Sequence, residues 1–160
     1  KIGFFDPYIP NGYEKVYGIN RYKTLFELLQ NSDIVSVNTP LNSETRGMIN
    51  KDFLEKMKKG SYLLNLSRGP IVQNKDLILE NILTNKLEGY ATDVWTHEPP
   101  LKNDKFHNAW RDNLEYLKGK VIVNPHTSYY SDQALNESRM KACSTCLDII
   151  NERFINNKII

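Results

Sequence analysis

Short apolar runs alternate with amphipathic stretches along this chain of 160 residues. Most of the runs are apolar without polar alternation, as expected for strands that are covered on both faces of a sheet. Strands that alternate with helices predict crossover units and a mostly parallel sheet. The predicted strands are Ile2–Phe5, Ile34–Val37, Tyr62–Leu66, Gly89–Val94 and Lys120–Val123.

The stretches between these runs carry the signals of helices. Thr24 and Glu27 form a capping box, while Asn50 and Asn74 are candidate caps of two further helices. The longest periodic stretch runs from about Ser131 to Phe154. Each predicted helix has an apolar stripe that can pack on the sheet.

The connection between Glu98 and Lys120 is long for a link between strands. It contains apolar residues at helical spacing, followed by Gly119 as a stop: Phe106, Trp110, Leu114 and Leu117. We therefore expect an extra amphipathic helix here. Packing on its own domain is favoured over covering a site or contacting another subunit.

Composition excludes several classes of protein. The formal net charge is +2 and no Lys/Arg run stands out, so no nucleic-acid partner is expected. No apolar stretch approaches the length of a membrane span. The single Cys143-x-x-Cys146 pair indicates inert thiols in a reducing compartment, and we expect no metal site.

Three chemically complementary residues each follow an apolar run. They are Arg68, Glu98 and His126. Ligands of open parallel sheets bind beyond the carboxyl ends of the strands, which is where these residues are expected. Each residue alone is better explained as a surface ion pair, a loop charge or a structural histidine. Together they indicate a site with an anion clamp, a carboxylate and a proton-transfer group.

Asp6 ends the first predicted strand. In dinucleotide-binding folds, an acidic residue here accepts hydrogen bonds from the adenosine ribose, which favours NAD over NADP. An Asp-Pro pair is also a common turn opener. The glycine-rich phosphate loop that should precede it is absent, so the central strand of the order 3-2-1-4-5-6 is missing. We therefore expect a piece of a longer polypeptide, with two strand edges unpaired.

With these residues in place, the chain resembles the D-isomer-specific 2-hydroxyacid dehydrogenase family over nearly its whole length. Within the family, Asp6-Pro7-Tyr8, Asn11-Gly12 and the segment from Tyr130 to Ala134 are most similar to the C-terminal-binding protein branch of NADH-dependent corepressors. Other features are similar to D-lactate dehydrogenases. The segments that carry the family resemblance are Asp6-Pro7-Tyr8, Asn38 to Leu41, Thr45 to Asn50, Leu64 to Pro70, Asp93-Val94, Glu98-Pro99 and Pro125-His126-Thr127.

The resemblance implies an α/β fold with a doubly wound, Rossmann-type parallel sheet, incomplete in this chain. Residues 1–127 would form the C-terminal part of the dinucleotide-binding domain. Residues 128–160 would form a crossover helix that returns toward a substrate domain. The family also implies NAD as cofactor, a homodimer, and a small 2-keto or 2-hydroxy acid as substrate. We expect a cytoplasmic location, or a nuclear one for a corepressor.

The resemblance also implies roles for single residues. His126 would be the general acid and base, Glu98 would hold its imidazole, and Arg68 would bind the substrate carboxylate. Tyr129 would line the substrate pocket, at a position where the corepressor branch typically has tryptophan. The implied cofactor-binding set is Asp6, Pro7, Tyr8, Thr39, Pro40, Ser67, Arg68, Asp93 and His126.

Three functions remain open at this point. The first is an NAD-dependent oxidoreductase that interconverts a D-2-hydroxy acid and a 2-keto acid by hydride transfer. The second is an NADH-responsive dimeric scaffold or transcriptional corepressor, and the third is a nucleotide-binding segment without activity of its own. Formate dehydrogenases of this superfamily have glutamine at the position of Glu98, so Glu98 disfavours formate chemistry.

Overall fold

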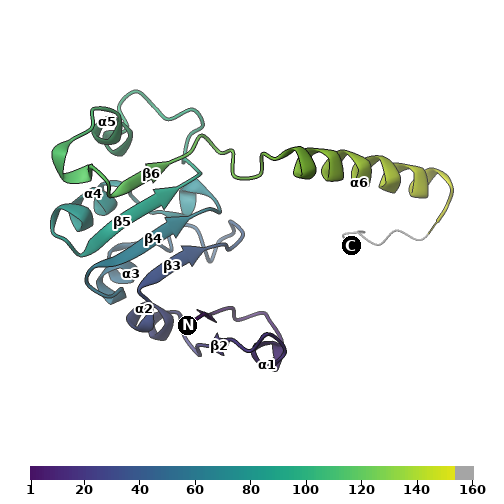
Figure 1. The fold of residues 1–160 in the computed structure, drawn as a ribbon, viewed down its shortest axis with the longest axis horizontal. Coiled ribbons are helices and arrows are strands. Elements are labelled where there is room, and N and C mark those ends of the chain that lie inside the picture. Colours follow the sequence, from purple (N-terminus) through teal and green to yellow (C-terminus); the bar gives the residue numbers. More distant parts are fainter. Residues whose placement is uncertain (154–160) are drawn as a thin grey trace. The chain divides into compact units, whose positions relative to one another are not determined.

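The structure is a computed structural model that describes residues 1–153 and divides the chain into two units, Lys1–Pro125 and a second that begins at His126 (Figure 1). The elements are β1 (Gly3–Phe4), α1 (Tyr13–Tyr17), β2 (Asn20–Arg21), α2 (Leu25–Asn31), β3 (Ile34–Val37), α3 (Lys51–Lys56), β4 (Ser61–Asn65), the 3₁₀ turn η1 (Gly69–Ile71), α4 (Asp76–Leu83), β5 (Leu87–Thr92), α5 (Lys105–Arg111), η2 (Glu115–Leu117), β6 (Val121–Val123) and α6 (Asp132–Ile150).

Four parallel strands form the main sheet of the first unit, in the order β3-β4-β5-β6. Their register places Val35, Leu63, Tyr90 and Val121 side by side in one row. The carboxyl ends of all four strands therefore lie along one edge of the sheet. This edge is where an open α/β sheet binds its ligand.

Local capping explains where the helices begin. The Thr24 hydroxyl accepts a hydrogen bond from the Glu27 backbone N–H at 3.1 Å, and Asn50 Oδ1 accepts one from the Phe53 N–H at 2.9 Å. Asn74 Oδ1 accepts from the Asp76 N–H at 2.9 Å. These side chains satisfy amides that have no partner within the first turn of the helix. The predicted caps Thr24 and Asn50 are confirmed, whereas the N-cap position of α4 is Lys75, one residue after the predicted Asn74.

The predicted strands are present with ends that shift by at most two residues. The two-residue strand β2 was not predicted, because Asn20–Arg21 carries no apolar run. The single helix expected between Glu98 and Lys120 is two pieces, α5 and η2. Asn113 between them has a φ of 52°, a left-handed conformation that ends a right-handed helix.

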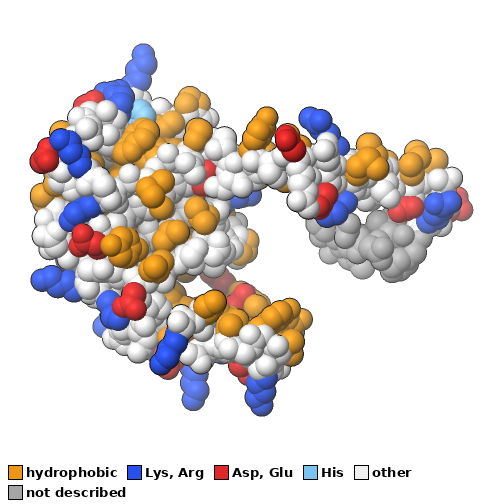
Figure 2. All heavy atoms as spheres, viewed as in Figure 1, with side chains coloured by type: hydrophobic (Ala, Val, Ile, Leu, Met, Phe, Trp, Pro, Cys, Tyr) orange, Lys and Arg blue, Asp and Glu red, His pale blue; other side chains and the backbone are white. Residues whose placement is uncertain are grey.

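One face of the main sheet is buried and the other is open among the described residues. The strands β3 to β6 are neighbours in the same order as in the sequence. Because crossovers between parallel strands of one sheet are right-handed, the helices of these crossovers lie on the same face of the sheet. The opposite face exposes Ile34 at 64%, Tyr62 at 44% and Ile122 at 65% (Figure 2). The expectation that the strands are covered on both faces is therefore wrong for the part of the chain that the structure describes.

A second, two-stranded parallel sheet is formed by β1 and β2. No strand within residues 1–153 joins it to the main sheet. The expectation of an incomplete sheet is thus confirmed for these residues. With β2 and β1 in the places of strands 3 and 2, the arrangement agrees with the order 3-2-1-4-5-6, in which one further strand lies between these two groups. β6 then adds a strand beyond the six of that order.

The second unit contains α6, which Ser131 caps by accepting a hydrogen bond from the Ala134 N–H at 3.1 Å. Cys143 and Cys146 are exposed on this helix and form no disulfide with each other. The predicted end of the helix at Phe154 lies outside the described residues. Within residues 1–153, no helix combines the length and the apolar character needed to cross a membrane.

The central row of the sheet yields a stability prediction. Leu63 is fully buried on β4, between Val35 and Tyr90. We expect Leu63→Ala to lower the free energy of unfolding by about 2–5 kcal/mol, because the packed sheet cannot fill the space that the lost side-chain atoms leave. Urea unfolding, followed by the tryptophan fluorescence of the first unit, measures this free energy. Ile34→Ala, on the open face, is the matched control and should change stability far less; equal losses would contradict the assigned faces.

Candidate cofactor and active site

A cavity of about 760 Å³ lies at the carboxyl ends of β3 and β4. It is lined by the segments that follow these strands, residues 38–41 and 66–68. The structure thus brings together four residues that the sequence pointed to, namely Thr39, Pro40, Ser67 and Arg68. Their individual roles stay predictions.

The Ser67 hydroxyl fastens the two segments together by donating a hydrogen bond to the Thr39 carbonyl oxygen. Asn65, fully buried at the end of β4, shapes the turn that follows. Its side-chain amide donates to the Arg68 carbonyl oxygen at 3.0 Å, and its Oδ1 accepts from the Ser67 N–H at 3.2 Å. Arg68 is thereby held at the rim of the cavity. Asn65 was missed as a site residue, although a polar amide inside an apolar run was a usable signal.

The Thr39 side chain offers a test of whether a nucleotide fits this cavity. Its hydroxyl oxygen is buried and has no hydrogen-bond partner in the described protein. A buried hydroxyl that lacks a partner costs free energy that a ligand can recover. The cavity, its backbone carbonyl and amide groups and this hydroxyl therefore fit the amide, hydroxyl and phosphate groups of a dinucleotide.

The segment after β1 carries Asp6, Pro7 and Tyr8. Asp6 Oδ1 accepts from the Tyr8 N–H at 2.8 Å, and the Tyr8 hydroxyl donates to the Glu44 carboxylate. Arg21 stabilises the same segment by donating to the Asp6 carbonyl oxygen at 3.0 Å. The Tyr8–Glu44 bond links this segment to the turn that follows the cavity-lining residues 38–41. Asp6 has a further carboxylate oxygen that could accept a ribose hydroxyl.

Gly69 joins the Arg68 turn to the segment that carries Glu98. A Cβ atom at Gly69 would lie 2.0 Å from the Trp95 carbonyl carbon and 2.3 Å from the Thr96 nitrogen. These are backbone atoms that cannot rotate away, so only glycine fits. Gly69 was not singled out from the sequence, because a glycine that follows an arginine gives no sign of a distant backbone contact.

Glu98 is exposed, and its Oε1 accepts a hydrogen bond from the Trp95 backbone N–H at 2.9 Å. Asp93, at the end of β5, is buried, and its N–H donates to the Asn65 carbonyl oxygen at 3.2 Å. Glu98 and Asp93 are thus attached to the same corner of the sheet as Arg68. Two carboxylates are therefore brought to the corner that carries the Arg68 guanidinium.

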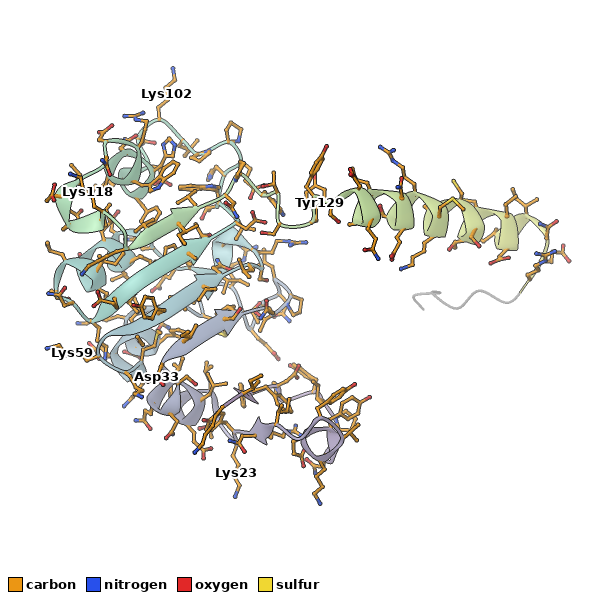
Figure 3. All side chains as sticks on the ribbon, in the orientation of Figure 1. Lys23, Asp33, Lys59, Lys102, Lys118 and Tyr129 are labelled. Carbon is orange, nitrogen blue, oxygen red and sulfur yellow. The ribbon has the colours of Figure 1, made fainter. Side chains whose placement is uncertain are left out.

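His126 and Tyr129 belong to the second unit. His126 has a left-handed backbone with a φ of 55°, which is uncommon outside glycine. Its ring centroid lies 6.5 Å from that of Tyr129 in an edge-on arrangement. Tyr129 is 62% exposed (Figure 3). The pairing of His126 with Glu98 stays a prediction, as does the pocket role of Tyr129.

Comparison with known families identifies the class of protein. The family described as D-isomer specific 2-hydroxyacid dehydrogenase, NAD binding domain, matches residues 1–128. The chain belongs to this family, and NAD is the cofactor of the matched domain. The Rossmann-type fold and the NAD cofactor expected from the sequence are confirmed.

Individual relatives agree with this family. The D-specific alpha-keto acid dehydrogenase of Enterococcus faecium is 40% identical over 133 residues, which are 79% of this chain and 40% of the relative. A formate dehydrogenase of Chaetomium thermophilum is 45% identical over 86 residues, 54% of this chain and 23% of the relative. The chain thus spans less than half the length of these relatives.

A solved structure shows the same fold. The D-lactate dehydrogenase of Lactobacillus jensenii with NAD⁺ superposes with a TM-score of 0.82 at 22% identity, over 100% of this chain and 48% of that one.

No group of three or more His, Cys, Asp or Glu side chains within residues 1–153 is placed to hold a metal ion.

The contact at Gly69 yields a second prediction. Gly69→Ala forces the Arg68 turn away from residues 95–96, so we expect a loss of about 1–3 kcal/mol in stability and a drop in any NADH-linked activity of the intact protein. Gly60→Ala is the control, because its Cβ would meet open space and only its φ of 75° opposes the change. A Gly69→Ala protein with activity equal to that of Gly60→Ala would show that the contact does not shape the site.

The buried hydroxyl of Thr39 yields a third prediction. Thr39→Val keeps the shape and removes a hydrogen-bonding group, so NADH should bind about 3- to 10-fold more weakly. Titration calorimetry of the intact protein measures this. Thr84→Val is the matched control, because Thr84 ends α4 shortly before β5 begins, at the opposite end of the strands from the cavity. Equal affinity in both variants would remove Thr39 from the cofactor site.

Proposed function

We propose that the protein containing this chain interconverts a D-2-hydroxy acid and a 2-keto acid with NAD as cofactor. One observation carries the proposal: the Arg68 turn and the Glu98 segment meet at Gly69, beside the cavity of an NAD-binding domain. A guanidinium and a carboxylate held at one corner supply an anion clamp and a partner for an imidazole.

Each residue has a defined task in this proposal. Arg68 binds the carboxylate of the keto acid through paired N–H donors and turns its carbonyl group toward the cofactor. His126 donates a proton to the carbonyl oxygen in the reducing direction and removes it in the oxidising direction. Glu98 holds the imidazole in the orientation for this proton transfer. NADH supplies the hydride when it is bound.

The proposal includes the partners and location expected of such an enzyme. These are a small 2-keto or 2-hydroxy acid, a second copy of the protein in a homodimer, and the cytoplasm. Glu98 supports a keto acid rather than formate as the substrate. The alternative is a dimeric NADH-responsive scaffold or corepressor, supported by the resemblance of the segments Asp6–Gly12 and Tyr130–Ala134 to that branch.

The fourth prediction tests this function in the intact protein. NADH absorbance is followed against pyruvate, glyoxylate and branched 2-keto acids. We expect His126→Ala to lower kcat by about 10²–10⁴-fold, because the proton donor is lost, with little change in NADH affinity. Lys118→Ala, which removes an exposed side chain outside the candidate site, is the control and should retain turnover.

Full turnover in His126→Ala would exclude the proposed mechanism. Saturable NADH binding that changes the oligomeric state, with no turnover of any acid by the wild type, would support the corepressor instead.

A further inference from the structure

Lys75 is a lysine in an unusual place. The lysines labelled in Figure 3, Lys23, Lys59, Lys102 and Lys118, point outward from the protein. Lys75 is only 7% exposed and lies directly before α4. Its side chain lines a second cavity of about 310 Å³, next to residues 96 and 97.

The buried ammonium contacts the segment that leads to Glu98. Its nitrogen lies 3.6 Å from the ring centroid of Trp95 and 5.6 Å from that of Phe106. It also donates a long hydrogen bond of 3.4 Å to the Val94 carbonyl oxygen. A cation over a tryptophan face in a desolvated place is among the stronger cation–π arrangements.

This placement is unfavourable for Lys75 itself. Burial lowers the pKa of Lys75 from 10.5 to about 8, although the Asp104 and Glu98 carboxylates act in the opposite direction. The positive end of the α4 dipole also disfavours a cation at this position. A residue whose placement is unfavourable for stability commonly contributes to a functional site.

The contacts of Lys75 continue to Glu98. Val94 and Trp95, which the ammonium contacts, precede Glu98 by four and three residues, and the Trp95 N–H donates to Glu98 Oε1 at 2.9 Å. We propose that Lys75 is a positioning residue that fixes residues 94–98 through the Val94 carbonyl and the Trp95 ring, and so holds Glu98 in place. Its effect on turnover rests on the proposed function, whereas its hold on Trp95 does not.

Protonation of Lys75 is part of this inference. The neutral amine makes no cation–π interaction with the Trp95 ring. Residues 94–98 are therefore held less tightly when Lys75 is deprotonated. The charged or titratable groups that face this region are Glu98, Asp104, His97, the Asp76–Lys105 ion pair and His107, whose ring lies 5.4 Å from that of Trp95.

The fifth prediction uses ¹⁹F NMR of the intact protein labelled with 5-fluorotryptophan. The resonance that disappears in Trp95→Phe belongs to Trp95. We expect its chemical shift to move with a midpoint near pH 8 in the wild type. This step should vanish in Lys75→Met and remain in Lys105→Met, which changes an exposed lysine at the rim of the same cavity. Steps caused by His97 or His107 persist in both variants.

Turnover and stability provide the second part of the test. We expect Lys75→Met to lower kcat about 10- to 100-fold, because Glu98 is displaced, with the KM for NADH nearly unchanged. Lys75→Arg stays charged, so its kcat should be higher than that of Lys75→Met. This kcat should also persist above pH 8. The folded pKa of Lys75 lies below its ordinary value, so stability rises with pH between about 8 and 10.5. Lys75→Met should therefore leave the Tm at pH 7 unchanged or higher.

The outcomes separate the two proposals. A Trp95 step near pH 8 that survives in Lys75→Met, or a fall in Tm with kcat intact, would overturn the positioning role. If the wild type turns over no keto acid, the proposed function fails, and the Trp95 resonance still decides whether Lys75 holds the segment.

Discussion

The candidate site depends on the contact between two backbone segments at Gly69. There the turn that carries Arg68 touches residues 95–96 so closely that no side chain can lie between them. Parallel strands end at the same edge of a sheet, yet their loops diverge unless something joins them. This contact converts two separate loops into one surface with a cation and a carboxylate at its rim.

Polar groups at the strand ends reinforce this surface. The Asn65 side chain closes the Arg68 turn, while its carbonyl oxygen accepts the Asp93 N–H. Thr92, which is paired with Asn65 in the register of β4 and β5, donates to the Val94 carbonyl oxygen at 2.9 Å. The same oxygen accepts a bond from Lys75. Buried polar groups of this kind are costly unless they are paired, and here each bond fixes a loop that bears a charged residue.

The fold was largely readable from the sequence, and the site only in part. Apolar runs predicted the main strands because burial needs continuous apolar positions, and Thr24 and Asn50 marked helix starts by local chemistry. The roles of Gly69 and Lys75 could not be predicted from the sequence. They come from the Trp95 backbone, 26 residues after Gly69, and from the Trp95 ring, 20 residues after Lys75. The open face of the sheet was missed because apolar runs do not tell which face a neighbour covers. Arg68 and Glu98 could be placed because strand ends in a parallel sheet share an edge.

The open sheet face has a consequence for handling the polypeptide. Ile34, Tyr62 and Ile122 lie on it, and β3 borders it with an edge that no described strand pairs. Exposed apolar rows beside an unpaired strand edge favour association between chains. Expressed as residues 1–160 alone, the polypeptide should bind hydrophobic dyes and lose solubility as its concentration rises.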